Sequence, residues 1–179
     1  DCLLQYFVHL WYYIWMIKRA LITSVCAFAI LFGIVMLTAP VISVLSISNR
    51  KTQSQRIFYS IKNLDDFVIS YTHSVNKGRV HDYYSIDNNG VLILNQTEFV
   101  SYGAGIPEPE ETPGASFSVE GNTYLIKNID RKLEKLVMAV GVTANHTIRF
   151  DFAGKEIGSE IPLKNYFEPQ TSLVLKVKK

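Results

Sequence analysis

Residues 20–39 read ALITSVCAFAILFGIVMLTA, and no charged residue occurs anywhere from Ala20 to Asn49. At about 1.5 Å of rise per residue, a helix over residues 20–39 is about as long as the hydrocarbon core of a bilayer is thick, roughly 30 Å. A helix buried in a soluble protein would need a larger surrounding domain than the residues after 49 can build. The stretch therefore predicts a transmembrane anchor helix, to which we assign residues 18–49.

Basic residues lie on both sides of this stretch, Lys18 and Arg19 before it and Arg50 and Lys51 after it. The excess of lysine and arginine that marks the cytoplasmic side of a membrane segment is therefore ambiguous here. A short basic region followed by a long apolar one is the layout of a signal anchor, which would export everything after Asn49. We expect an uncleaved, single-pass anchor with its C-terminal domain outside the cytoplasm.

Residues 1–17 form a separate aromatic segment in this interpretation. The block from residue 2 to residue 17 is rich in tyrosine and tryptophan, which favour the membrane interface, and it is short for a membrane span. Three alternatives remain open. The segment is an interfacial helix, a short second span that forms a hairpin by turning at Lys18–Arg19, or sequence that precedes a start at Met16.

Residues 50–179 are long enough for one compact domain and too short for two of ordinary size. The whole chain has a formal net charge of +2, so it lacks the basic surface of a nucleic-acid-binding protein. Cys2 and Cys26 both precede the domain, which excludes a disulfide or a reactive thiolate within it. We therefore expect an apolar core to hold this domain together.

The domain carries the pattern of a mainly β protein. Short β-branched and aromatic runs alternate with turn signals such as the Asp-Asn-Asn-Gly of residues 87–90. We expect residues 50–56 to be a polar linker and residues 130–136 to form a helical turn. Strands near ten residues apart favour a β-sandwich or barrel-like domain after the helix. The expected strands cover residues 67–72, 80–86, 91–94, 99–102, 117–120, 123–126, 137–140, 146–152 and 172–177.

Two segments are more particular than ordinary strand ends. The first is YTHSV at residues 71–75, followed by Asp82, and the second is FVSYGAGIP at residues 99–107. Together they resemble a family of small extracytoplasmic domains of unknown function that are encoded beside tripartite ATP-independent periplasmic (TRAP) transporters of the TAXI subtype. That family carries a similar His-Ser-Val, an acidic residue at the spacing of Asp82, and Ser-x-Gly-Ala-Gly-x-Pro. The chain departs from it by having Asp where Glu is usual, and by its aromatic N-terminus.

The resemblance implies a membrane-anchored accessory subunit in the bacterial inner (cytoplasmic) membrane. Such a subunit would dock on the TRAP membrane subunit or position the TAXI solute-binding protein, with the lipid bilayer as its other partner and no nucleic acid. We assign the residues of the two motifs as candidate ligand- or partner-binding residues. These residues are His73, Ser74, Asp82, Ser101, Gly103, Ala104, Gly105 and Pro107.

The two motifs can also be interpreted from the properties of their residues, without the resemblance. Gly103 and Gly105 permit a tight turn, which either lets two sheets meet or presents backbone N–H groups to an anion. An inward-facing His73 would reach Asp82 or Ser101 by a hydrogen bond, as part of a structural network or of a pocket. His73 and Ser74 do not form a nucleophile and base by adjacency, because neighbouring strand side chains point to opposite faces.

We expect no enzyme activity, no cofactor and no metal site. The sequence has no P-loop, no Rossmann fingerprint, no Gly-x-Ser-x-Gly and no cysteine-rich zinc pattern. A hydrolase that uses Ser74 or Ser101 with His73 is a third alternative. The main alternative to the accessory subunit is a stand-alone extracytoplasmic module that binds a small ligand or ion. In the anchor, the small residues Ala27, Ala29 and Gly33 would allow close packing against another membrane helix.

Overall fold

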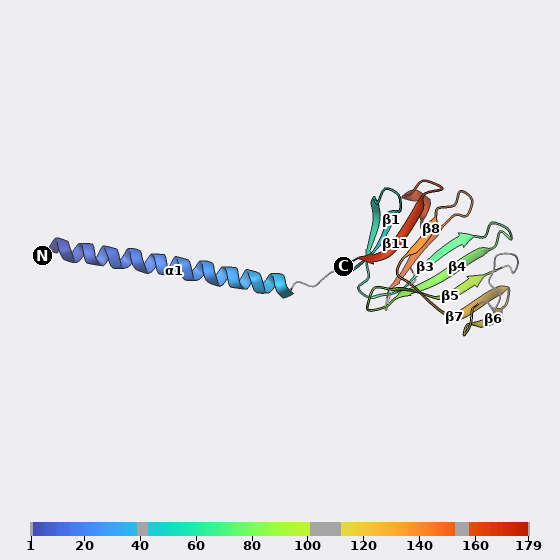
Figure 1. Cartoon of the computed structure of the whole chain (residues 1–179), viewed down its shortest axis with the longest axis horizontal. Coiled ribbons are helices and arrows are strands. Elements are labelled where there is room, and N and C mark those ends of the chain that lie inside the picture. The colour runs from blue at the N-terminus through green and yellow to red at the C-terminus, as the bar shows by residue number, and fades with distance from the viewer. Residues whose placement is uncertain (1, 39–42, 101–111, 153–157, 179) are drawn as a thin grey trace. The chain divides into compact units, whose positions relative to one another are not determined.

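The computed structural model describes residues 2–38, 43–100, 112–152 and 158–178. The chain divides into two compact units, Asp1–Val41 and Ile42–Lys179, which we describe one at a time (Figure 1). The first contains the helix α1, and the second contains all of the described strands. We call the second unit the β-domain.

Helix α1 runs without interruption over Cys2–Thr38. At about 1.5 Å per residue it is roughly 55 Å long. The hairpin alternative for residues 1–17 is therefore wrong, because it needs a turn at Lys18–Arg19 and these residues lie inside the helix. Among the described residues, one helical segment, Trp11–Ile34, is long and apolar enough to cross a membrane.

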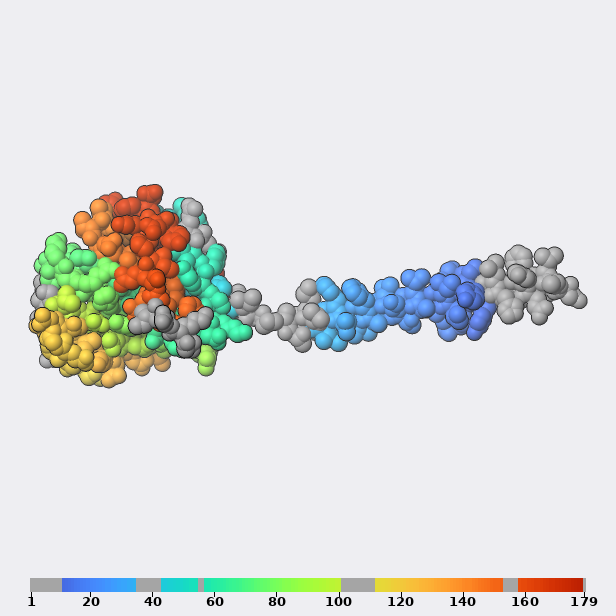
Figure 2. Space-filling view, turned by 180° about the vertical axis from the view of Figure 1, so that it is seen from behind, coloured from blue at the N-terminus to red at the C-terminus, as the bar shows by residue number. Residues whose placement is uncertain are grey.

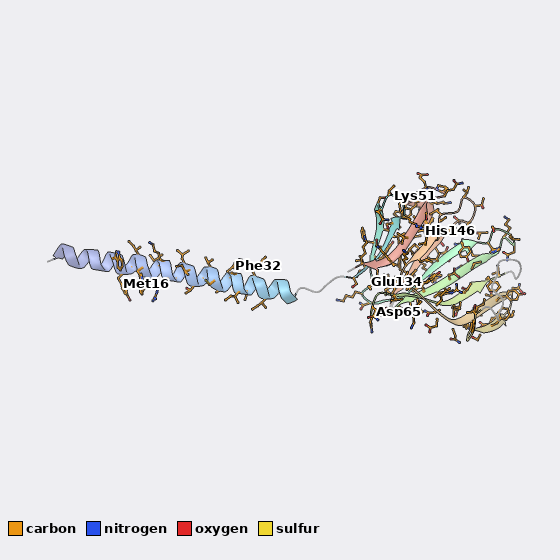
Figure 3. The ribbon with its side chains drawn as sticks, viewed as in Figure 1. Met16, Phe32, Lys51, Asp65, Glu134 and His146 are labelled. Carbon is orange, nitrogen blue, oxygen red and sulfur yellow. The ribbon has the colours of Figure 1, made fainter. Side chains whose placement is uncertain are left out.

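The described side chains of α1 project on several sides of the helix, as Met16 and Phe32 illustrate (Figure 3). The described side chains from Trp11 to Phe32 are exposed, although most of them are apolar. The guanidinium of Arg19 lies 4.0 Å from the centre of the Trp15 ring, which is a cation–π contact. The apolar side chains from Trp11 to Phe32 are therefore not buried within the unit that contains the helix.

The expected end of the anchor at residue 49 is wrong. Residues 44–49 form strand β1 (Val44–Asn49), in the middle of a sheet. Leu45 and Ile47 are fully buried in the core of the β-domain, and Ser46 and Ser48 alternate with them on the other face. The predicted linker at residues 50–56 is also partly wrong, because strand β2 begins at Gln55 and only residues 50–54 form the connection.

Within the described residues the strands form two antiparallel sheets, which are the two layers of a β-sandwich (Figure 1). This arrangement confirms the mainly β fold and selects the sandwich over the barrel. The smaller sheet has the order β2 (Gln55–Ser60), β1, β11 (Ser172–Lys178) and β8 (Leu136–Ala139). The larger sheet has the order β10 (Ile161–Pro162), β9 (Thr147–Phe152), β3 (Leu64–Thr72), β4 (Arg79–Ile86), β5 (Leu92–Phe99), β7 (Thr123–Leu133) and β6 (Ser116–Glu120).

The expected helical turn at residues 130–136 is wrong, because the long strand β7 continues to Leu133. Strand β7 pairs with β6 in its first half and with β5 near both of its ends. This pairing overrides the helix-forming tendency of its charged residues. The hairpin of β6 and β7, yellow in Figure 2, forms one edge of the β-domain. A short 3₁₀ helix, η2 (Leu163–Asn165), follows β10.

The main core lies between the two sheets. Strands from both layers contribute to it, and the ring of Tyr59 on β2 stacks on Phe150 of β9 with centroids 3.7 Å apart. The fully buried residues of this core with the largest side chains include Leu45, Ile47, Phe67, Leu92, Ile148, Leu163, Leu173 and Leu175. A second, smaller cluster of Val80, Phe99 and Ile126 lies where β4, β5 and β7 run together.

The predicted turn at residues 87–90 is confirmed and sets the register of β4 and β5. A carboxylate oxygen of Asp87 accepts hydrogen bonds from the backbone N–H groups of Asn89 and Val91, at 2.9 and 2.8 Å. Gly90 has a φ of +85°, and a Cβ there would lie 3.2 Å from Val177. Glycine is therefore needed at this position for both its conformation and its size.

Candidate ligand cavity between the two sheets

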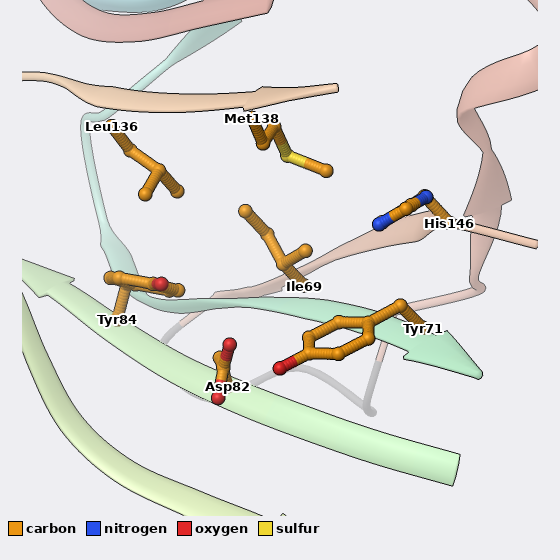
Figure 4. A pocket seen from close by; sticks show the side chains of 7 residues that line it. All are labelled: Ile69, Tyr71, Asp82, Tyr84, Leu136, Met138 and His146. Atoms are coloured by element: carbon orange, nitrogen blue, oxygen red, sulfur yellow. The ribbon is translucent and has the colours of Figure 1, made fainter. Parts of the chain in front are cut away.

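A cavity of about 200 Å³ lies between the smaller sheet and the inner face of the larger one (Figure 4). Strand β8 covers it from one side, and β3 and β4 form the other side. Its lining is mainly apolar, with one acid, two phenols and one imidazole. The described lining residues are Ile69, Tyr71, Asp82, Tyr84, Leu136, Met138 and His146.

Asp82 is a charged residue on the inner face of β4, between residues that pack in apolar clusters. Alternation along this strand places residues 80, 82 and 84 on one face, and both Val80 and Tyr84 are buried in apolar clusters. The cross-strand neighbours of Asp82 are Ile69 on β3 and Thr97 on β5. The Thr97 hydroxyl donates a hydrogen bond of 2.8 Å to one carboxylate oxygen of Asp82.

Burial raises the pKa of Asp82 to about 6, against the lowering effects of the Thr97 hydrogen bond and of the charge of Arg131. The desolvated carboxylate is less stable than it would be in water, so its proton is held to a higher pH. Above this pKa the cavity carries a negative charge. Among the described residues, no lysine or arginine forms an ion pair with Asp82.

Two tyrosines stand beside the acid. The hydroxyl of Tyr71 points toward Asp82 (Figure 4), and burial, followed by the charge of Asp82, raises the pKa of both Tyr71 and Tyr84. Both phenols are therefore neutral at physiological pH. The Tyr84 ring stacks on Phe67 with centroids 5.1 Å apart, and this contact fixes its orientation.

His146 closes the cavity next to Tyr71, and the two rings stack with centroids 5.6 Å apart. The backbone N–H of Gly141 donates a hydrogen bond of 3.0 Å to Nδ1 of His146. Burial, followed by the charge of Arg79, lowers the pKa of His146, so the neutral ring is favoured at neutral pH. Because Nδ1 accepts a hydrogen bond, the proton of the neutral ring is on Nε2.

The structure does not bring His73 to Asp82. His73 lies in the turn between β3 and β4, where its Nδ1 accepts hydrogen bonds from the backbone N–H groups of Val75 and Asn76 at 3.3 and 3.5 Å. Its own backbone pairs with Gly78 across the turn. Asp82 is several residues further along β4, on the inner face. The role of His73 in the described structure is to support this turn.

The other predicted motif residues are not part of the described cavity. Ser74 is exposed in the same turn as His73. The remaining members, Ser101, Gly103, Ala104, Gly105 and Pro107, lie outside the described residues. The two interpretations of the turn at Gly103 and Gly105, a tight connection between sheets or an anion site formed by backbone N–H groups, therefore stay predictions.

The outer face of the larger sheet carries a polar network that the sequence reasoning missed. The Ser70 hydroxyl lies 2.7 Å from Nδ1 of His81 and 3.3 Å from a carboxylate oxygen of Glu160. The same Glu160 forms an ion pair of 3.2 Å with Arg79, and Arg79 also donates to the Thr147 hydroxyl at 2.7 Å. The network thus joins β3, β4 and β9 to the segment before β10.

This Ser–His pair lacks the arrangement of a nucleophile and its base. Ser70 is only 1% exposed, and the acid contacts the serine instead of the far nitrogen of the histidine. A structural role in fixing the register of the sheet therefore fits the contacts. Ser70 and His81 are cross-strand partners in the β3–β4 hairpin, and this pairing depends on a register that the local sequence pattern does not contain.

Helix geometry separates the three small residues proposed for membrane packing. Ala29 and Gly33 are four residues apart on α1 and so share one face. Ala27 is about 200° around the helix from Ala29 and lies on nearly the opposite side. Only Ala29 and Gly33 can approach the same partner helix closely.

Cavity residues other than Asp82 were not predicted. Tyr71 and Tyr84 are on the same face as Asp82, so strand alternation could have found them. Leu136, Met138 and His146 come from distant segments, and only the packing of the two sheets brings them to the cavity. Among the described residues, no group of three or more His, Cys, Asp or Glu side chains is placed to hold a metal ion.

The described residues that line the cavity fall within a match to a known protein family. The family profile described as Domain of unknown function (DUF1850) matches residues 67–157, just over half of the 179-residue chain. The chain belongs to the DUF1850 family. The DUF1850 match contains all the described cavity residues, from Ile69 to His146, while α1, β1, β2 and β11 lie outside it. No curated protein and no solved structure matches this chain.

Proposed function

We propose that this DUF1850 protein is a membrane-anchored accessory subunit of a TAXI-type TRAP transporter, with its β-domain on the extracytoplasmic side of the bacterial inner membrane. It docks on the membrane subunit or positions the solute-binding protein, and it acts by contact without catalysing a reaction. The exposed apolar helix is the observation that carries this proposal, because Trp11–Ile34 can span a bilayer and the side chains from Trp11 to Phe32 are exposed.

The transporter partnership rests on the resemblance of residues 71–75, Asp82 and residues 99–107 to domains encoded beside such transporters. A membrane anchor supports this role physically. Confinement beside the bilayer raises the effective concentration of the β-domain for a partner in the same membrane. A single helix cannot form a transport pathway by itself, so the role assigned to it is attachment and lateral packing.

Affinity purification tests this partnership. The full-length chain is co-expressed with the TAXI-type permease subunit and the solute-binding protein, and is then purified in a mild detergent. We expect the permease subunit to be recovered with the wild-type chain. Gly33→Leu should reduce the recovery about tenfold, because a bulky side chain separates the helix from its partner by more than a close contact tolerates.

Ala27→Leu is the matched control, since it adds the same side chain on the opposite face of α1. Its recovery of the permease subunit should equal that of the wild type. Equal losses for the two variants would show that the Ala29–Gly33 face is not the interface. Failure of the wild-type chain to recover either transporter component would contradict the accessory role.

A second candidate function is the binding of a small ligand by the β-domain. The cavity between the sheets favours it, because an acid without an ion-pair partner among the described residues lies in a largely apolar space. Small-molecule sites are commonly apolar clefts with a few placed polar groups. Of the motif residues first assigned to ligand binding that the structure describes, Asp82 alone lines this cavity.

A further inference from the structure

We infer that the cavity between the two sheets binds a small organic ammonium ion, with the carboxylate of Asp82 as its counter-ion. The inference rests on the second candidate function above and assigns the ligand class. Nothing in the family description specifies a ligand.

The charges around the cavity favour a cation. Among the described residues, Asp82 is the only acidic one that lines the cavity. The described charged or titratable groups that face it from neighbouring elements are Tyr71 on β3, Tyr84 on β4, Arg131 on β7 and His146. The tyrosines and the histidine are neutral near pH 7, and Arg131 is exposed and forms no described ion pair with the acid. An anion would therefore be repelled by the negative charge of Asp82, which Arg131 opposes only from an exposed position and without an ion pair.

The polar atoms of the cavity suit an N–H donor. One oxygen of Asp82 accepts a hydrogen bond from Thr97, and the second carboxylate oxygen has no hydrogen-bond partner among the described residues. The Tyr71 hydroxyl oxygen lies on the cavity side beside this acid and is a further acceptor (Figure 4). A charge-assisted hydrogen bond from an ammonium group to a desolvated carboxylate is roughly twice as strong as a neutral one.

The walls suit an organic ion better than a hydrated metal. Ile69, Leu136 and Met138 present only apolar atoms, and the two tyrosine rings supply aromatic surface that attracts cations. A cavity of roughly 150 Å³ lined by apolar side chains holds a benzene ring. A space of about 200 Å³ therefore admits an ammonium group with a short alkyl chain.

Isothermal titration of the full-length chain in a non-ionic detergent tests the ligand class. The probes are n-butylammonium, the neutral 1-butanol and the anionic butanoate, which share one alkyl chain and differ in charge. At pH 8 we expect n-butylammonium to bind at least tenfold more tightly than either of the others. At pH 5 its affinity should fall about tenfold, because only about a tenth of Asp82 remains ionised below its pKa of about 6.

Asp82→Asn preserves the shape of the side chain and removes its charge, so it should weaken n-butylammonium binding at least tenfold. Asp65→Asn is the matched control. Asp65 is an exposed carboxylate on β3 (Figure 3), and its removal should change the affinity less than twofold. If Asp82→Asn fails to fold, the comparison of the three probes and the pH dependence of the wild type still decide the question.

Two outcomes overturn the inference in distinguishable ways. If 1-butanol or butanoate binds as tightly as n-butylammonium, the ligand class is wrong while the ligand-binding function stands. If no probe binds at millimolar concentration, both the ligand class and the ligand-binding function of this cavity are wrong. Neither result bears on the partnership with the transporter.

Discussion

Asp82→Asn is expected to raise the free energy of unfolding by about 3 kcal/mol at pH 8 and to leave it nearly unchanged at pH 4. The folded protein raises the pKa of this carboxyl from 3.8 to about 6. One pKa unit corresponds to about 1.4 kcal/mol of differential stability between the two protonation states. The asparagine amide retains an oxygen to accept the Thr97 hydrogen bond and has no charge to desolvate.

The direction follows from the number of protons bound in each state. Between pH 4 and pH 6 the folded protein holds a proton on Asp82 that the unfolded chain has released, so the contribution of this group to stability falls as the pH rises. The contribution is complete below the unfolded pKa of 3.8 and is lost above the folded pKa of about 6. The difference between variant and wild type should therefore grow across this window and then level off.

Urea unfolding followed by circular dichroism at several pH values measures this difference. Asp65→Asn again serves as the control, and its stability should differ little from that of the wild type at each pH. A difference between Asp82→Asn and the wild type that does not change with pH would contradict the burial of an unpaired acid. A variant that is less stable than the wild type at pH 8 would show that the carboxylate has a stabilising partner.

A fragment that begins at residue 42 is expected to fold, and a fragment that begins at residue 50 is not. The shorter fragment lacks β1, which pairs with both β2 and β11 in the middle of the smaller sheet. Its loss removes Leu45 and Ile47 from the core and separates β2 from the rest of the sheet. Thermal unfolding followed by near-ultraviolet circular dichroism distinguishes the two fragments.

A single substitution in the full-length chain also tests whether β1 belongs to the core of the β-domain. Ile47→Ala should lower the free energy of unfolding by about 2–5 kcal/mol, because Ile47 is fully buried and its removal leaves a cavity. Val137→Ala on β8 is the control, and since Val137 is 41% exposed it should cost well under about 1 kcal/mol. Cooperative unfolding of the fragment that begins at residue 50 would contradict the assignment of residues 44–49 to the core.

The strands were largely predictable from residue 64 onward, because apolar and polar residues alternate within them and turn residues separate one strand from the next. Residues 87–90 predicted their turn correctly, and β3, β4, β6, β9 and β11 lie close to their predicted positions. The start of the β-domain was not predictable by charge alone. Leu45 and Ile47 alternate with two serines, but this pattern lies within a run of residues without charge. The pairing with β2 and β11 shows that the segment is a strand.

The candidate site was only partly predictable for a related reason. Asp82 could be singled out because it lies at the spacing of the acidic residue in the motif that the chain resembles. Its neighbours depend on the register of β3 against β4 and on how β8 covers them, and local patterns contain neither. The histidine next to the cavity is therefore His146, far away in sequence, whereas the nearby His73 supports a turn.

The most direct test of a membrane-anchored extracytoplasmic β-domain is protease treatment of intact spheroplasts that express the full-length chain, followed by alkaline carbonate extraction of the membranes. We expect the chain to stay in the carbonate-washed membrane pellet, and externally added protease to remove the β-domain while leaving a membrane-embedded fragment that contains residues 11–34. Recovery of the intact chain in the supernatant, or full protection of the β-domain until the spheroplasts are lysed, would contradict this arrangement.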